Sequence, residues 1–124
     1  MNNQFVIVGA GLAGAAAVST LREEGFDGTV TLIGSEPHPP YERPPLSKEH
    51  LRGEASFQQS LVHPADFYRA HRIDTRFGEP VARVHVASRM IELADGEHLP
   101  YDRVLIATGG RNRTPAIPGF ELEG

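Results

Sequence analysis

The chain has 124 residues, a net charge of −4 and no cysteine. Its length fits one domain or part of one, and its apolar content of 40% and charged content of 23% are typical of a folded, soluble protein. The acidic balance disfavours a nucleic-acid partner, which needs a basic surface. The missing cysteines exclude disulfides, thiolate metal sites and a redox-active dithiol in this stretch.

The first 36 residues predict a strand, a helix and a second strand. The apolar run 5–8 is typical of a parallel strand buried on both faces. Gly9–Gly14 matches G-x-G-x-x-G and opens a helix expected to reach about Glu24, before a β-branched strand over 29–33. The uncharged stretch 5–21 lacks the basic start of a signal peptide and is short for a membrane span. We therefore expect a soluble, cytoplasmic protein without a membrane partner.

Beyond this unit, turn residues and short apolar runs divide the chain into further elements. In chain order we expect an extended proline-rich loop over 37–45, a short helix capped by Ser47 and running through Leu51, a helix over 64–72, an antiparallel meander of strands near 81–86, 90–93 and 98–101, a buried parallel strand over 104–107, and a linker over 111–124. The predicted fold class is α/β, with a Rossmann-like βαβ unit and parallel sheet plus a small antiparallel β-meander.

The glycine motif has the chemistry of a nucleotide site. Gly9 allows a tight turn, Gly11 leaves room for a pyrophosphate to reach the backbone, and Gly14 lets the helix pack against the strand. The helix N-terminus directs N–H groups and a partial positive charge at the phosphates. Glu36, 22 residues after Gly14, is placed to bind ribose hydroxyls and would repel a 2′-phosphate, which argues against NADP at this site. Taken singly, the turn is also compatible with packing alone, and Glu36 with a solvated surface acid.

Three separated motifs, in their order along the chain, resemble a known family. They are the glycine turn with its acid at Glu36, the segment Arg43-Pro44-Pro45-Leu46-Ser47-Lys48, and the segment Ala107-Thr108-Gly109-Gly110-Arg111. Across essentially all of its length the chain resembles the FAD-dependent pyridine nucleotide oxidoreductases, and within them the ferredoxin reductase branch.

The resemblance implies FAD as the cofactor and a role for each matching residue. Lys48 would approach the flavin ring as the catalytic residue, because a cation there stabilises the negative charge that develops as the ring accepts hydride. Without the resemblance, Arg43 and Lys48 are equally well explained as solvated charges, and residues 108–110 as a flexible exit turn. The implied cofactor-binding residues are Gly9, Gly11, Leu12, Ala13 and Gly14 at the pyrophosphate, Glu36 at the adenosine ribose, Val81 with its backbone at the adenine, Arg43, Pro44 and Lys48 along the cofactor, and Ala107, Thr108, Gly109 and Arg111 in a second turn.

The resemblance also implies a reaction and a domain plan. Disulfide reductases of the glutathione-reductase type carry a cysteine pair after the acidic strand end, where this chain has none. We therefore expect electrons to pass from NAD(P)H through FAD to a ferredoxin or rubredoxin that serves an oxygenase. Residues 1–110 would form the N-terminal part of a split FAD-binding domain and 111–124 a linker toward an absent NAD(P)H-binding domain. The fragment alone is expected to be inactive.

Two other functions stay open from the sequence. One is a dehydrogenase domain that binds NAD(H) at Gly9–Gly14, although the 43–48 loop and the meander count against it. The other is a non-catalytic FAD-binding module of the apoptosis-inducing factor type. No metal is expected, since the six histidines fall into none of the common ligand spacings and no cysteine joins them. No Gly-x-Ser-x-Gly elbow supports hydrolase chemistry.

Overall fold

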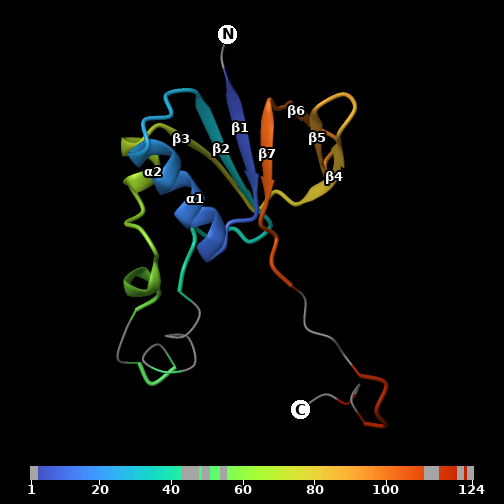
Figure 1. Ribbon diagram of the computed structural model, residues 1–124. Coiled ribbons are helices and arrows are strands. Elements are labelled where there is room, and N and C mark those ends of the chain that lie inside the picture. The colour runs from blue at the N-terminus through green and yellow to red at the C-terminus, as the bar shows by residue number, and fades with distance from the viewer. Residues whose placement is uncertain are drawn as a thin grey trace.

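The computed structural model describes residues 3–42, 48, 51–53, 56–110, 115–119 and 122. Within these residues, two sheets and two α-helices form the body of the structure, whose arrangement Figure 1 shows. The elements are β1 Gln4–Val8, α1 Leu12–Glu23, β2 Thr29–Gly34, the 3₁₀ turn η2 Phe57–Ser60, α2 Phe67–Ala70, β3 Ile73–Phe77, β4 Val81–His85, β5 Met90–Leu93, β6 His98–Pro100 and β7 Arg103–Ile106.

A parallel sheet of four strands, in the order β3-β2-β1-β7, carries the predicted βαβ unit. β1 lies between β2 and β7 and pairs in parallel with both, so that Val8 stands beside Ile33 on one side and Ile106 on the other. Asp102 fixes the start of this pairing, because its carboxylate accepts a 2.7 Å hydrogen bond from the Gln4 N–H while its own N–H donates to the Gln4 carbonyl. The predicted α/β fold class is confirmed.

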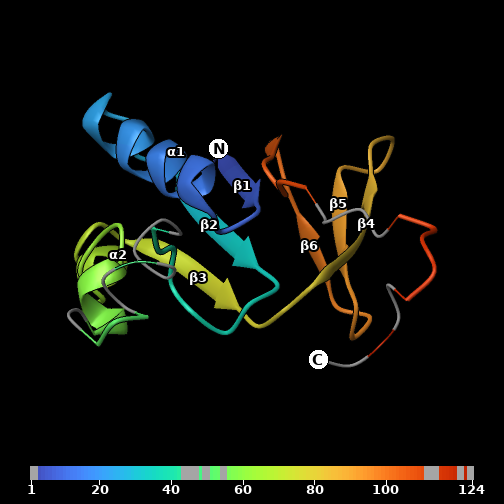
Figure 2. The ribbon, with the colours of Figure 1, turned by 90° about the horizontal axis from the view of Figure 1, so that it is seen from below.

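The two faces of the parallel sheet are covered by different partners, which gives three layers (Figure 2). Side chains alternate between the faces along each strand. Ile7, Val30 and Leu32 point toward the helices, where they pack with Val18 of α1 and Tyr68 of α2. On the opposite face the alternate strand positions pack against the second sheet in a cluster of Val6, Val8, Ile33, Ile91, Leu93 and Tyr101.

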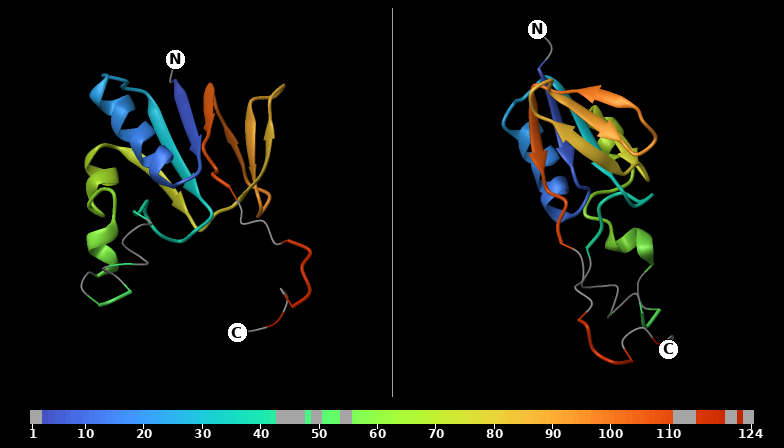
Figure 3. Two further views of the ribbon diagram at one scale, coloured as in Figure 1. Left: turned by 60° about the horizontal axis from the view of Figure 1, so that its bottom comes forward. Right: turned by 90° about the vertical axis from the view of Figure 1, so that its right-hand side faces the viewer.

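The second sheet is the predicted meander, three antiparallel strands in the order β4-β5-β6. Its tight turns require unusual backbone angles, with Arg89 at φ +53 before β5 and Gly96 at φ +95 before β6. The register shifts between Val81 and Arg83, where β4 begins beside β5. Figure 3 shows this sheet standing beside the parallel sheet, with residues 115–119 lying apart from both.

The structure adds a strand that was not predicted and shortens a helix that was. β3 pairs in parallel with β2, although Asp74 and Arg76 interrupt its apolar pattern; it is an edge strand, where such charged side chains reach solvent. The helix predicted over 64–72 is reduced to α2, Phe67–Ala70, with turns on both sides. Arg72, at φ +55, turns the chain out of helical geometry directly before β3.

The prediction that residues 104–107 form a buried strand is wrong in its burial. β7 is parallel to β1 as expected, but Leu105 is 38% exposed and Ile106 is 60% exposed. Within the described residues, β7 pairs only with β1, and of its side chains only Val104 packs against a core cluster. The strand therefore offers an open edge and uncovered apolar side chains.

The loop after β2 is irregular, as its prolines predict. Its described part makes an isolated antiparallel bridge between Tyr41 and Leu61, with hydrogen bonds from the Glu42 N–H to the Ser60 carbonyl and from the Val62 N–H to the Pro40 carbonyl. The predicted helix from Ser47 lies largely outside the described residues, and the described contact in this stretch is a 3.1 Å hydrogen bond from the Arg52 N–H to the Lys48 carbonyl. No helix in the described ranges has both the length and the apolar character needed to cross a membrane.

Candidate functional site

The candidate site lies at the edge of the parallel sheet where β1, β2 and β7 end. In Figure 1 these strands run toward the lower edge, where the glycine turn, the chain after β2 and the chain after β7 all leave the sheet. The Gly9 N–H donates to the Ile33 carbonyl at 2.8 Å, and the Ala107 N–H donates to the Val8 carbonyl at 2.7 Å. Ligands of open α/β sheets gather at such carboxyl ends.

Two glycines of the motif are required by close backbone contacts. Gly9 has φ +120, and a Cβ built on it would collide with the carbonyl of Ala107, so the first turn and the turn after β7 touch. A Cβ on Gly14 would collide with the Gly9 carbonyl and lie 3.3 Å from Cδ1 of Leu32. The expected roles of Gly9 in turning the chain and of Gly14 in packing helix against strand are thus visible in the fold.

Gly11 differs from these two because it faces open space. Apart from its chain neighbours, no described residue has an atom within 4 Å of a Cβ built at this position, and Gly11 is the N-cap of α1. The first turn of the helix carries no acidic residue, and Leu12 and Ala13 are exposed. The α1 N-terminus therefore presents N–H groups and a partial positive charge beside an open cradle, which suits a diphosphate.

Glu36 is the acid of the site, and the structure holds it at the end of β2. Its carboxylate accepts a 2.7 Å hydrogen bond from the Tyr41 hydroxyl, and its carbonyl accepts one from the Gly78 N–H at 2.8 Å. Glu36 is exposed, and a carboxylate has room for several donors. Tyr41 therefore orients a carboxylate, a group whose chemistry suits hydrogen bonds from ribose hydroxyls.

Tyr41 is a site residue that sequence reasoning left without a role. Its ring lies 5.3 Å from that of Phe57, and the His38 ring lies 5.2 Å from Phe57. These contacts bring the start of the proline-rich loop and η2 together next to Glu36. The only signal in the sequence was the presence of aromatic residues around this loop, which does not reveal which pairs meet.

The remaining predicted site residues fall into four groups. Val81 is half-buried and lies just after the end of β3. The ends of β3 and β2 are joined there by a 3.0 Å hydrogen bond from the Glu79 N–H to the Gly34 carbonyl. Thr108 and Gly109 are exposed after β7, with Gly109 at φ +70. Lys48 is exposed, and no contact of its side chain with the other site residues is described. Arg43, Pro44 and Arg111 lie outside the described residues.

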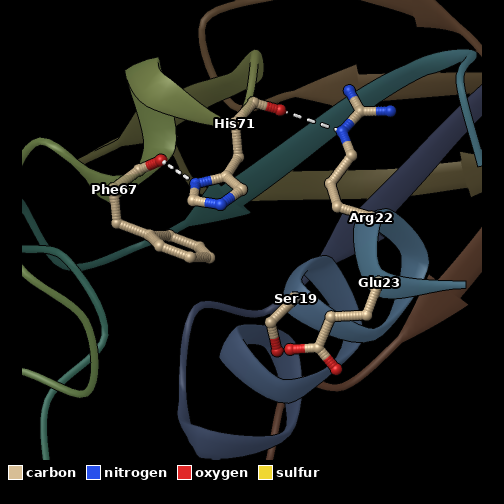
Figure 4. A pocket seen from close by; sticks show the side chains of 5 residues that line it. All are labelled: Ser19, Arg22, Glu23, Phe67 and His71. Carbon is tan, nitrogen blue, oxygen red and sulfur yellow. Dashed lines mark hydrogen bonds between the residues drawn. The ribbon is translucent and has the colours of Figure 1, made fainter. Parts of the chain in front are cut away.

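A hollow between α1 and α2 has the wrong chemistry for an anionic ligand. Figure 4 shows its lining of Ser19, Arg22, Glu23, Phe67 and His71. Arg22 donates from Nε to the His71 carbonyl at 2.9 Å and from its two terminal nitrogens to three further backbone carbonyls at 2.8–2.9 Å. Burial, and then the charge of Arg72, lower the pKa of Arg22. The guanidinium thus serves as a structural tie between chain segments.

Taken together, the sheet edge fits a dinucleotide. The open position at Gly11 and the start of α1 suit a pyrophosphate, and Glu36 suits a ribose. These groups come from the ends of neighbouring strands, as the predicted arrangement requires. The edge also receives the turn after β7, which contacts Gly9 directly.

The curated proteins that this chain resembles include two reductases of bacteria. The chain is 43% identical over 120 residues to rhodocoxin reductase of Rhodococcus erythropolis, covering 97% of this chain and 28% of that protein. It is 45% identical over 129 residues to the ferredoxin reductase component of chlorobenzene dioxygenase from Cupriavidus sp. (strain PS12), covering 100% of this chain and 30% of the relative. The chain thus spans less than a third of the length of these relatives.

Solved structures with the same fold as this chain include reductases of the same kind. The putidaredoxin reductase in its covalent complex with putidaredoxin matches 95% of this chain and 28% of its own, at a TM-score of 0.90 and 36% identity. The ferredoxin reductase for the CYP199A2 system of Rhodopseudomonas palustris gives a TM-score of 0.90 and 32% identity over 98% of this chain and 30% of its own. The model of the family described as pyridine nucleotide-disulphide oxidoreductase matches residues 3–124. The chain belongs to the pyridine nucleotide-disulphide oxidoreductase family, among relatives that are ferredoxin reductases.

Proposed function

We propose that this chain is the N-terminal FAD-binding segment of a flavoprotein ferredoxin reductase, which passes electrons from NAD(P)H via FAD to a ferredoxin or rubredoxin serving an oxygenase in the cytoplasm. The observation that carries the proposal is the meeting of the glycine turn, Glu36 and the turn after β7 at one sheet edge. The acceptor class is supported by relatives such as the ferredoxin reductase component of chlorobenzene dioxygenase. FAD, when bound, would accept hydride and release the electrons to the acceptor.

In this proposal the residues at the α1 N-terminus bind the pyrophosphate. Gly11 lets the phosphates approach the backbone, and the N–H groups of Leu12, Ala13 and Gly14 offer hydrogen bonds. The Glu36 carboxylate, oriented by Tyr41, accepts hydrogen bonds from the hydroxyls of the adenosine ribose. The Val81 backbone, beyond the end of β3, meets the adenine.

The flavin end of the cofactor is assigned to the second and third motifs. Lys48 places a cation near the ring, where it stabilises negative charge, and Arg43 and Pro44 line the cofactor. Ala107, Thr108, Gly109 and Arg111 form the second contacting turn. Support for this second turn comes from the contact of Ala107 with Gly9, which holds it beside the pyrophosphate position.

We also propose the domain plan. Residues 1–110 form the N-terminal part of a split FAD-binding domain, and 111–124 lead toward an NAD(P)H-binding domain. The uncovered apolar side chains of Leu105 and Ile106 support this plan, because further strands or helices of a larger domain would bury them. This chain by itself then lacks the parts needed for turnover.

The experiment uses the longer protein that contains this chain. Its absorption spectrum after purification should show the bands of bound flavin. NAD(P)H should bleach these bands, and the reduced flavin should pass electrons to a ferredoxin.

A pair of variants tests the role of Lys48. Lys48→Ala should keep the flavin and slow its reduction, while Arg52→Ala, which removes a nearby exposed cation, should leave the rate of flavin reduction unchanged. A colourless protein that binds NAD(H) alone would overturn the proposal. Equal rates in wild type and Lys48→Ala would remove Lys48 from the flavin site.

A further inference from the structure

Three metal-ligating side chains meet on the outer face of the antiparallel sheet. Along β4, β5 and β6 the residues that face the core include Val84, Ile91 and Leu99. Their alternate neighbours therefore share the opposite face. These include His85, Glu92 and His98, one from each strand. Glu92 stands directly opposite His98 in the register, and His85 lies on the diagonal through its partner Met90.

The side-chain atoms are close enough to share one ion. Nε2 of His85 lies 2.7 Å from Oε2 of Glu92, and one ligand atom from each of the three residues falls within 4.8 Å of the others. The rings of His85 and His98 lie 6.0 Å apart and nearly parallel. His98 is exposed, so a rotation of its side chain can aim a nitrogen at the position between the other two.

We propose that His85, Glu92 and His98 form a binding site for a divalent transition-metal ion, with Zn²⁺ as the ion it suits. Two imidazoles and one carboxylate are a known zinc ligand set, which leaves a fourth position for water. Zn–N bonds of about 2.1 Å place tetrahedral ligands roughly 3.4 Å apart. To bind the ion, Nε2 of His85 and Oε2 of Glu92 therefore move slightly apart, and the His98 side chain rotates toward the ion.

The charges around the cluster favour ligation by Glu92 and partly oppose the ion. The carboxylate of Glu92, held by the 2.7 Å hydrogen bond with His85, is the anionic ligand of the set. Arg83, opposite Glu92 in the register, adds a positive charge that repels a dication. Removing this charge should therefore tighten binding.

A cluster of three acidic residues elsewhere in the structure is a poorer candidate for a metal site, because an arginine already binds it. Oxygens of Glu79, Asp95 and Glu97 also lie close together, but Arg76 already occupies their negative field, at 2.8 Å from Glu97 and 3.6 Å from Glu79. The hydrogen bond to Glu97 raises the pKa of Arg76 further. By contrast, the described hydrogen bond within the His85 cluster joins two of its own ligands, His85 and Glu92.

A bound ion would join all three strands of the meander. His85 lies four residues beyond Val81 along β4, a distance of about 13 Å, so the site is separate from the proposed adenine contact. Metal binding to the folded sheet alone would raise the unfolding temperature in proportion to the logarithm of the metal concentration. The expected effect of zinc is on stability, with flavin binding unchanged.

The test is a calorimetric titration of the protein with zinc chloride, together with thermal unfolding with and without zinc. Wild type should bind one ion per chain and unfold at a higher temperature when zinc is present. His98→Ala and Glu92→Gln should each weaken zinc binding at least about 10-fold. Loss of a residue that only hydrogen-bonds to a metal ligand already costs about that much, and loss of a ligand itself should cost no less. Arg83→Gln should bind several-fold more tightly.

His71→Ala is the matched control, because His71 is also exposed but stands at the end of α2. It should bind zinc as wild type does. Absence of binding in wild type would overturn the proposal. So would equal affinity in wild type, His98→Ala and Glu92→Gln, since zinc would then be held elsewhere. His98 is exposed, so its replacement leaves the fold intact and the comparison valid.

Discussion

The hydroxyl of Tyr41 donates a 2.7 Å hydrogen bond to Oε2 of Glu36, which ties the proline-rich loop to the end of β2. We expect Tyr41→Phe to weaken FAD binding by about 2- to 12-fold, since one hydrogen bond is worth about 0.5–1.5 kcal/mol. The effect should vanish when Glu36 is already alanine, because the two side chains act as one unit. Fluorescence titration of the longer protein with FAD, for both single variants and the double variant, measures this coupling. Additive losses would mean that Tyr41 acts independently.

Glu36→Ala should weaken FAD binding more than Tyr41→Phe does. Loss of a charge-assisted hydrogen bond to the ribose costs about 1.5–3 kcal/mol, or about 10- to 150-fold in the dissociation constant. Glu42→Ala is the control, as Glu42 is exposed on the same loop and its described hydrogen bond uses only the backbone. FAD retained equally by Glu36→Ala and wild type would exclude Glu36 as the ribose ligand.

The glycines of the motif should separate folding from binding. Gly11→Ala meets open space at negative φ, so we expect nearly unchanged unfolding in urea but loss of FAD affinity, because a methyl group then fills the cradle. Gly14→Ala should instead lower the free energy of unfolding, since its Cβ collides with the Gly9 carbonyl. Urea unfolding and FAD titration of the longer protein distinguish the two. Strong FAD binding by Gly11→Ala would contradict the placement of the pyrophosphate.

Arg22 should be irreplaceable by lysine. Its guanidinium reaches four backbone carbonyls, in the turn before β2 and at the end of α2, and an ammonium cannot reproduce this planar set of donors. We expect Arg22→Lys to reduce the free energy of unfolding by about 2 kcal/mol or more. Arg69→Lys, at an exposed position of α2, should change it by less than about 0.5 kcal/mol. Equal free energies of unfolding of the two variants in urea would exclude a stabilising role for the hydrogen bonds of Arg22 to these carbonyls.

Tyr68 should make stability fall in alkaline solution. Burial raises its pKa to about 12, and within the described residues its hydroxyl has no hydrogen-bond partner. Between about pH 10 and pH 12 the unfolded chain releases this proton and the folded chain keeps it, so stability declines as the pH rises, by up to about 2.7 kcal/mol. Tyr68→Phe should remove this decline and leave neutral-pH stability unchanged or higher. Tyr41→Phe, measured alongside by urea unfolding, should keep the decline.

Predictions from the sequence succeeded where the signals are local. The run 5–8, the glycine motif and the strand over 29–33 each occupy contiguous residues, and they became β1, α1 and β2 with small changes in their ends. β3 was missed because its charged residues hide the pattern, and only its pairing with β2 makes it a strand. The burial of β7 was predicted wrongly, since burial depends on what covers a strand, which its own residues do not encode.

The sequence by itself predicted the βαβ unit, because glycines at fixed spacing permit only a few backbone paths between a strand and a helix. The family was predicted from three separate motifs in their order along the chain, and the matching family model confirms it. The tertiary structure decided which distant side chains meet. Tyr41 reaches Glu36 because the loop folds back through its bridge to Leu61. His85, Glu92 and His98 share one face because the register of three strands places them there. Such contacts depend on strand pairing between residues far apart in the chain, and no single stretch of sequence records that pairing.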